Sequence, residues 1–131
     1  ILLLGDYLIG GVLLGKYIAP ESIADVLSQL KAPLGVYSVL GNHDWWVDGQ
    51  LMWSALEKAG ISVLENSAIP VERDGGGFWV AGLADDTTRS PDIDATLKQA
   101  NDERPVIMMT HDPATFLTMS DRPVVTVAGH T

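Results

Sequence analysis

The sequence contains no cysteine, and this absence removes several kinds of chemistry. Disulfide bonds, thiolate metal ligands and cysteine nucleophiles are all excluded. Basic residues are few as well, because eight Lys and Arg stand against 17 Asp and Glu, for a formal net charge of -9. They form no cluster along the chain, so we expect no surface for nonspecific binding of nucleic acid.

The sequence also lacks a membrane span. The apolar start, residues 1–15, is too short, and Asp6 and four glycines interrupt it. It has neither the basic start nor the small-residue cleavage site of a signal peptide. We therefore expect a protein that is cytoplasmic or peripheral to the membrane. Since the chain opens on Ile1, in an apparent buried strand and without Met, we expect an internal piece of a longer protein.

What is present indicates one α/β domain of 131 residues, 47% hydrophobic and 19% charged. Short apolar runs alternate with helical patterns, which is typical of βαβ units and a largely parallel sheet. Asp74-Gly75-Gly76-Gly77 predicts a β-hairpin. The expected strands are 1–4, 34–40, 62–65, 68–73, 78–83, 105–110 and 123–128, and the expected helices begin at Pro20, Gln50 and residue 92.

Several local details follow from the same patterns. The first helix should turn Ile23, Val26, Leu27 and Leu30 inward, and the second Met52, Ala55, Leu56 and Ala59. Ser90-Pro91 reads as an N-cap and first-turn proline, with Ile93 and Leu97 facing the core. Residues 41–49 are expected to form a loop. The nearly continuous apolar runs of strands 105–110 and 123–128 predict burial on both faces.

Polar side chains follow four of the predicted strands, at the end where α/β sheets build their ligand sites. They are Asp6, the run Asn42-His43-Asp44, His111 and His130. Taken singly, Gly-Asp is common turn chemistry, and a lone histidine is more often structural than a ligand. Gly41-Asn-His-Asp44 is more specific, since average composition gives it on the order of once in 10⁵ windows. The four signals together favour a functional site.

Asp6, Asn42, His111 and His130 offer oxygen and nitrogen ligands suited to a divalent metal ion, namely Mn, Fe, Zn or Mg. Such an ion polarises a phosphoryl oxygen and activates water. His43, beside a ligand, would act as the general acid, with Asp44 holding the far nitrogen of its ring. Weaker candidates for substrate binding are Trp45, Trp46 and Arg89, whereas Asp85 and Asp86 read as loop or capping residues.

With these motifs the chain resembles the calcineurin-like metallophosphoesterase superfamily, and it is most similar to a bacterial branch of membrane-associated phosphodiesterases. The resemblance implies a four-layer α/β/β/α sandwich with two divalent metal ions. Asp6 would match the bridging carboxylate, Asn42, His111 and His130 would complete one metal site, and His43 would match the catalytic histidine paired with Asp44.

Two of the family's motifs do not occur in residues 1–131. These are the opening Asp-x-His, which supplies the other metal, and the second histidine of the closing Gly-His-x-His. We therefore expect a truncated sandwich, an incomplete domain that lacks its first metal-binding strand and its C-terminal part. The central strand left open predicts self-association through its edge.

The leading functional prediction is a metal-dependent phosphoester hydrolase of the phosphodiesterase or pyrophosphatase type. The resemblance implies that its substrate is lipid-like or a nucleotide. We expect this chain itself to be weak or inactive, because it keeps ligands for one metal only. The alternative is a non-catalytic α/β module that binds one metal or a partner protein.

Overall fold

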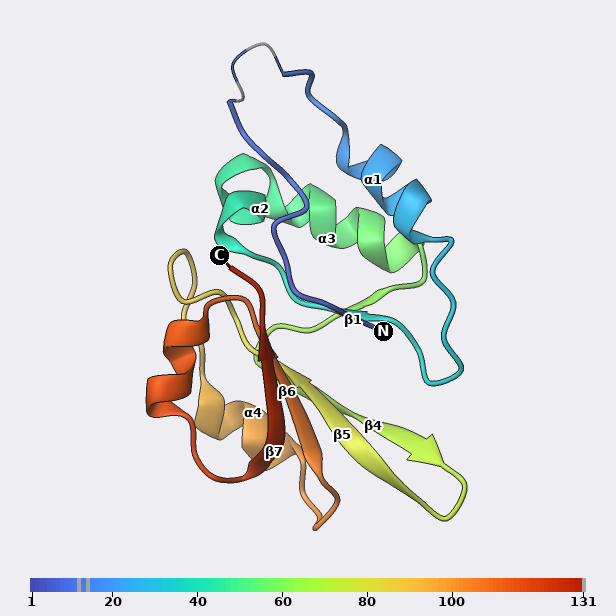
Figure 1. Ribbon diagram of the computed structural model, residues 1–131, viewed down its shortest axis with the longest axis vertical. Helices are drawn as coiled ribbons and strands as arrows, with labels where there is room; N and C mark the ends of the chain where they lie inside the picture. Colours follow the sequence, from blue (N-terminus) through green and yellow to red (C-terminus); the bar gives the residue numbers. More distant parts are fainter. Residues whose placement is uncertain (12, 14, 131) are drawn as a thin grey trace.

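The computed structural model describes residues 1–11, 13 and 15–130 (Figure 1). Helices and strands alternate over most of the chain. In order they are β1 (Leu2–Leu3), α1 (Pro20–Leu27), β2 (Tyr37–Ser38), α2 (Asn42–Val47), α3 (Gly49–Lys58), β3 (Ser62–Val63), β4 (Ser67–Arg73), β5 (Gly76–Gly82), α4 (Ile93–Gln99), β6 (Val106–Thr110), the 3₁₀ helix η1 (Pro113–Thr118) and β7 (Pro123–Ala128).

The strands form two sheets. In the first sheet the order is β1-β2-β3, and both pairs are parallel. In the second the order is β4-β5-β6-β7, where β4 and β5 form an antiparallel hairpin and the other pairs are parallel. The predicted mostly parallel sheet with one β-hairpin is thus confirmed.

Three hydrophobic cores show how the elements are layered. One lies between α1, α3 and the first sheet, and includes Met52, Leu56 and Val63. The second fills the space between the sheets, and the third lies between the second sheet and α4. The molecule therefore stacks helices, sheet, sheet and helix; in Figure 1 α1, α2 and α3 lie in the upper half, and the second sheet and α4 lie side by side in the lower half. This is the α/β/β/α order that the family resemblance implies.

Strand alternation explains why the second sheet serves two cores. Val80 and Met109 point to the space between the sheets, whereas Trp79, Ala81 and Met108 point to α4. Successive side chains of a strand face opposite sides, so a strand covered on both faces must be apolar at nearly every position. The run 106–110 meets this condition, and its predicted burial on both faces is confirmed.

Other local predictions were wrong, each for a reason visible in the structure. Val26 is 65% exposed, and Ala24 takes its place on the buried face of α1. β2 covers two residues of the predicted 34–40, because Gly35 has a φ of +94° and closes a turn onto Ala32. α4 is capped by Asp92, whose carboxylate accepts the N–H of Ala95, and not by Ser90.

The stretch after β2 is a second helix and not a loop. α2 begins directly after Gly41, whose N–H donates to the carboxylate of Asp44 at 2.9 Å. This bond is one half of a capping box, which stabilises the first turn of a helix. The other predicted helices and strands are present, although β1 and β3 are also only two residues long. α3 buries Met52, Ala55 and Leu56 as predicted and ends before Gly60, which has a φ of +81°.

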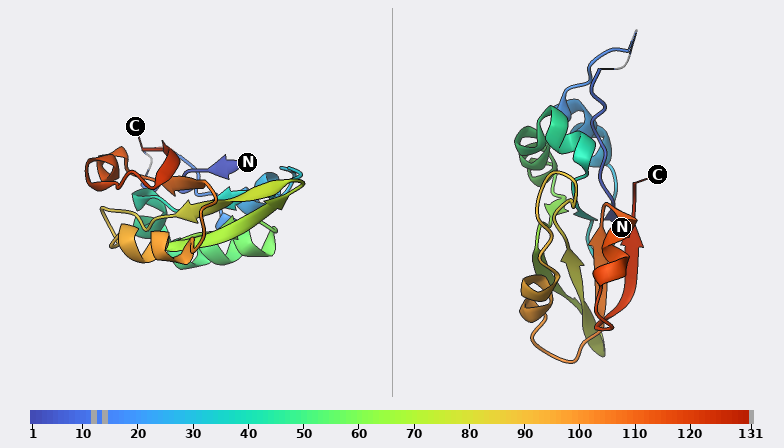
Figure 2. Two further views of the ribbon diagram at one scale, coloured as in Figure 1. Left: turned by 90° about the horizontal axis from the view of Figure 1, so that it is seen from below. Right: turned by 90° about the vertical axis from the view of Figure 1, so that its left-hand side faces the viewer.

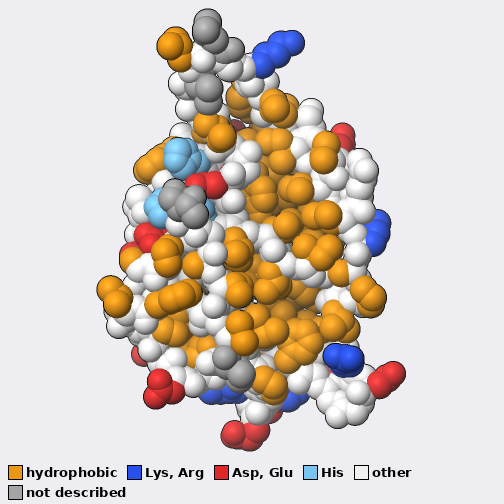
Figure 3. All heavy atoms as spheres, in the orientation of Figure 1, with side chains coloured by type: hydrophobic (Ala, Val, Ile, Leu, Met, Phe, Trp, Pro, Cys, Tyr) orange, Lys and Arg blue, Asp and Glu red, His pale blue; other side chains and the backbone are white. Residues whose placement is uncertain are grey.

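β1 and β7 are edge strands and lie on the same side of the molecule in both views of Figure 2. β7 is partly exposed there, with Val125 at 47%, so its predicted burial on both faces was wrong. The surface over these two edges is broadly hydrophobic (Figure 3). Self-association through the edge of β1 stays a prediction. Within the described part of the chain, every helix is too short or too polar to cross a membrane.

Replacing Met109 by Ala tests the core between the sheets. Met109 is fully buried there, so we expect a loss of about 2–5 kcal/mol in the free energy of unfolding, measured by urea denaturation. Val125→Ala, on the exposed side of the neighbouring strand, should change it by about 0.5 kcal/mol or less. Equal losses in both variants would contradict the described core.

Candidate metal centre

The predicted ligands come together where strands of both sheets end. Asp6 follows β1, Asn42 opens α2 after β2, His111 follows β6 and His130 follows β7. Asp6, His111 and His130 each offer one ligand atom, and these three atoms lie within 4.8 Å of one another. Side chains far apart in sequence therefore surround a single point, as the motifs predict.

His111 is the centre of the group. Its Nε2 atom lies 3.1 Å from Asn42 Oδ1, 3.1 Å from His130 Nδ1 and 3.3 Å from Asp6 Oδ2. Burial is graded around it, because His111 is 1% exposed while His130 is exposed. The group is thus anchored in the protein on one side and open to solvent on the other.

A backbone carbonyl sets the tautomer of His111. Its Nδ1 atom lies 2.6 Å from the carbonyl oxygen of Leu4. Since a carbonyl oxygen only accepts hydrogen bonds, Nδ1 carries the proton, and the lone pair of Nε2 is left free toward Asp6, Asn42 and His130. Such a second partner is the usual way in which proteins orient a metal-binding imidazole.

The backbone is strained at two of the four residues. Asp6 has a φ of +61° and His130 a φ of +37°, in the left-handed region that residues other than glycine seldom adopt. The described residues include one further case, Asn66. Strain of this kind tends to cluster at functional sites, where the surrounding fold holds it in place.

The glycines of the motifs allow the ligands to approach so closely. A Cβ atom on Gly5 would lie 2.5 Å from the nitrogen of Gly41 and 2.7 Å from His111 Nδ1. A Cβ on Gly41 would collide with the carboxylate of Asp6 and with the ring of His111. Both positions therefore need glycine for space.

Asp44 is fully buried and holds the loop of Asp6 against α2. Its Oδ2 atom accepts the backbone N–H groups of Asp6 and Gly41, and its Oδ1 atom accepts those of Tyr7 and Leu8, all at 2.8–2.9 Å. Burial raises the pKa of this carboxyl, and the four hydrogen bonds oppose that shift. The structure thus uses Asp44 differently from the predicted pairing with the His43 ring, because the carboxylate is occupied by backbone donors.

His43 lies next to the candidate metal ligands and outside the cluster of Asp6, His111 and His130. Its backbone N–H donates to Asp6 Oδ1 at 3.1 Å, and its ring packs edge-on against Trp46, with 4.9 Å between the ring centroids. The ring is half-buried, and Trp46 is 61% exposed. An imidazole and an exposed indole therefore stand beside the ligand group.

The other two substrate-binding candidates contact each other. Trp45 packs into the core between α1, α3 and the first sheet, and the guanidinium of Arg89 lies 4.5 Å from its ring centroid. Arg89 also donates to Glu65 at 2.8 Å. Sequence reasoning missed the part of Glu65, which carries no local signal. A role of Trp45, Trp46 or Arg89 toward substrate stays a prediction.

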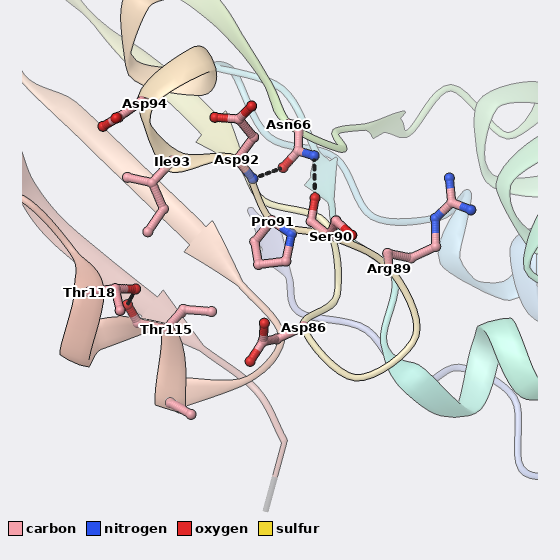
Figure 4. A pocket seen from close by; sticks show the side chains of 11 residues that line it. Asn66, Asp86, Arg89, Ser90, Pro91, Asp92, Ile93, Asp94, Thr115 and Thr118 are labelled. Carbon is pink, nitrogen blue, oxygen red and sulfur yellow. Dashed lines mark hydrogen bonds between the residues drawn. The ribbon is translucent and has the colours of Figure 1, made fainter.

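A polar cavity of about 750 Å³ lies between η1 and the loop before α4 (Figure 4). Asn66 shapes this loop, because its side chain donates to the carbonyl of Ser90 and accepts the N–H of Asp92. Arg89 lines the cavity, but its guanidinium is directed away from it, consistent with its bond to Glu65. Asp85 caps a turn by accepting the N–H of Thr88, in agreement with the predicted capping role.

Comparison with known proteins adds an independent finding. The family model described as calcineurin-like phosphoesterase matches residues 1–131. An uncharacterized metallophosphoesterase of Helicobacter pylori is 29% identical over 92% of the chain and 35% of its own length. For YkuE of Bacillus subtilis, also named an uncharacterized metallophosphoesterase, the values are 31%, 85% and 40%. A Danio rerio protein named a transmembrane protein with metallophosphoesterase domain is 32% identical over 85% of the chain and 29% of its own length.

The chain thus covers 35% to 40% of the length of the two bacterial relatives named above. No solved structure matches it significantly.

Replacing Asp44 by Asn tests the link between the Asp6 loop and α2. An amide group cannot accept at both of its ends, so two buried N–H groups would lose their partner, at a cost of about 2–4 kcal/mol in unfolding free energy. Because the Asp6 loop would shift, Mn²⁺ affinity measured by calorimetry should fall at least about tenfold.

Asp48→Asn is the matched control. Asp48 accepts one N–H, from Leu51, at an exposed helix cap where Asn serves about as well as Asp. It should leave unfolding and Mn²⁺ binding nearly unchanged. If Asp44→Asn is equally harmless, Asp44 does not have the structural role described.

Proposed function

Because this chain belongs to the calcineurin-like phosphoesterase family, we propose that its metal centre serves the metal-dependent hydrolysis of phosphoester bonds. The observation that carries the proposal is the convergence of Asp6, His111 and His130 within 4.8 Å, with Asn42 Oδ1 at 3.1 Å from His111. His43, attached to the same helix as Asn42, supports an acid–base role beside it.

The donor set fits a divalent metal ion. One carboxylate, one amide oxygen and two imidazole nitrogens are acceptable to Mn, Fe, Zn or Mg, and the His111 tautomer leaves the required lone pair free. When bound, the ion supplies positive charge that polarises a phosphoryl oxygen and activates water. Asp6 would be the carboxylate that helps to hold the ion, next to His111 and His130.

We assign to His43 the transfer of a proton to the leaving oxygen. A protonated imidazole carries an N–H at each ring nitrogen, and a positioned group of this kind contributes about 10²- to 10⁴-fold to rate. The edge-on contact with Trp46 limits the rotation of the ring. The exposed indole also supports an apolar group on the substrate, such as that of a lipid-like phosphodiester, over a compact nucleotide.

Metal binding is the first test. Mn²⁺ titrated into the wild-type chain should bind and raise its stability, by about 2.7 kcal/mol at 100 times the dissociation constant. His111→Ala and Asn42→Ala should each lose at least about tenfold in affinity, and EDTA should reverse the stabilisation. His43→Ala, which removes no ligand, is the control and should bind Mn²⁺ like the wild type. Unchanged binding in His111→Ala would rule out this site.

Hydrolysis of bis-p-nitrophenyl phosphate is the second test. We expect weak Mn²⁺-dependent turnover, because the described residues supply ligands for one ion only. His43→Ala should lower the rate by about 10²-fold or more, and more for a diester with a more basic leaving alcohol. Robust turnover that His43→Ala abolishes would contradict the weak activity of this chain but support the site.

The second candidate function is a non-catalytic module that binds one metal ion or a partner protein. The single ligand group among the described residues favours it. The two functions separate clearly in the tests above. Mn²⁺ binding that depends on His111, with no metal-dependent hydrolysis at any protein concentration, would favour the binding module.

A further inference from the structure

The connection between Asp6 and α1 exposes an unusual amount of apolar surface. We call its residues 9–18 the apolar arm, of which 9–11, 13 and 15–18 are described. Ile9 is 67% exposed, Leu13 89%, Tyr17 65% and Ile18 58%. These are four of the ten exposed large hydrophobic side chains of the described residues, and they fall within ten residues of sequence. Such a concentration usually marks an interaction surface, whereas single exposed apolar residues are ordinary.

The arm projects from the body of the molecule. Its described residues belong to the blue segment at the top of Figure 1, and the right-hand view of Figure 2 shows this segment extending beyond the helices in the same way. Figure 3 shows further hydrophobic side chains beside the pale blue histidines, in the same upper half of the molecule. A flat partner is therefore able to meet the arm without meeting the two sheets.

The charge of the arm differs from that of the whole chain. The chain has a formal net charge of -9, but residues 7–19 contain no Asp or Glu, and Lys16 is their only charged residue. Apolar side chains, a tyrosine and a lysine are the residue types that enter the interface of a lipid bilayer. A membrane surface, which is often anionic, would be repelled by most of this protein and not by the arm.

An apolar cavity lies at the base of the arm. It measures about 260 Å³, and its walls include Tyr7, Leu8, Ile18 and Ile23. This volume is below the roughly 300–1,000 Å³ of small-molecule sites, so the cavity is suited to part of a hydrocarbon chain. Tyr7 directly follows the metal ligand Asp6, so the cavity and the metal centre adjoin along the backbone.

The arm is also packed against the helix of the metal centre. A Cβ atom on Gly10 would lie 3.1 Å from a methyl group of Val47, at the end of α2. The same helix carries Asn42 and His43 at its start and the exposed Trp46. Contact between the arm and a surface would therefore bring the metal centre near that surface.

We propose that the apolar arm docks this protein on the surface of a lipid bilayer, with Ile9, Leu13, Tyr17 and Ile18 entering the interface and Lys16 pairing with lipid phosphates. Combined with the proposed function, on which this one consequence rests, docking would present phosphodiester groups of lipids to the metal centre. The docking itself needs no metal.

Vesicle cosedimentation tests the docking. The wild-type chain should bind vesicles of phosphatidylcholine with one quarter phosphatidylglycerol, with and without EDTA. The double variant Ile9→Ser with Tyr17→Ser should lower the affinity at least about tenfold, since two large apolar contacts are lost. Lys16→Gln should weaken binding to these vesicles more than to pure phosphatidylcholine.

Two single variants are controls. Val26→Ser matches Ile9 and Tyr17 in exposure, at 65%, but lies on α1, and Val125→Ser lies on the hydrophobic face over β7. Both should bind vesicles like the wild type. If Val125→Ser is as weak as the arm variant, the face over β7 binds lipid and the proposal is overturned. Absence of vesicle binding, or equal binding by wild type and arm variant, overturns it as well.

Sedimentation velocity without vesicles tests the other possibility, that the arm binds a second copy of this chain. Self-association that the arm variant abolishes would make the arm an interface between copies and would overturn the proposal. Failure of the docking proposal can also be told apart from failure of the proposed function. His111→Ala should lose Mn²⁺ and keep vesicle binding, whereas the arm variant should keep Mn²⁺ binding and lose the vesicles.

Discussion

The metal centre depends on one buried carboxylate. Each oxygen of Asp44 accepts two backbone N–H groups, three of them from the loop after β1 and one from the turn before α2. Together with the bond from the His43 N–H to Asp6 Oδ1, these four bonds join the loop of Asp6 to the start of α2, which carries Asn42. The hydrogen bonds explain why a ligand, an imidazole and this acid stand together at positions 42–44. The local sequence fixes the spacing of these three residues, and the bonds of Asp44 fix the position of the loop that follows β1.

This anchor also accounts for the strain at the site. A left-handed Asp6 costs on the order of 1–3 kcal/mol, and the cost is offset only where the surroundings allow no relaxed alternative. Two of the N–H groups held by Asp44, those of Asp6 and Tyr7, stand on either side of the Cα atom of Asp6, the strained residue. Gly41 brings the next backbone so close that even a methyl group would not fit. Contacts of the chain itself therefore hold the loop of Asp6 in its strained conformation.

Sequence patterns predicted the fold class and most elements, which depend on local periodicity. They also selected four candidate ligands that the fold brings together, because ligands of α/β sheets tend to follow strands. They failed where a distant residue decides. Val26 fits the helical stripe as well as Ala24 does, and only the position of α3 shows which one is buried. Asp44 was paired with its sequence neighbour His43, because the three N–H groups that occupy it come from residues 36–38 positions away. The bond of Arg89 to Glu65 spans 24 residues and left no local signal either.

The charges around the site bear on how an acidic chain would receive an anionic phosphoester. With a net charge of -9, its long-range field opposes such a substrate. Arg89 does little to offset this repulsion, since its guanidinium is already bound to Glu65 and turned away from the polar cavity. An imidazole binds a metal ion in its neutral form, so His111 and His130 as ligands would add no positive charge to the site. Attraction of a phosphoryl group would therefore have to come from the bound cation and from a protonated His43, both of which act over a few ångströms. A surface that carries the substrate to this short range would make attraction from solution unnecessary. The apolar arm, whose one charged residue is Lys16, is where the field of this protein permits such a surface to approach.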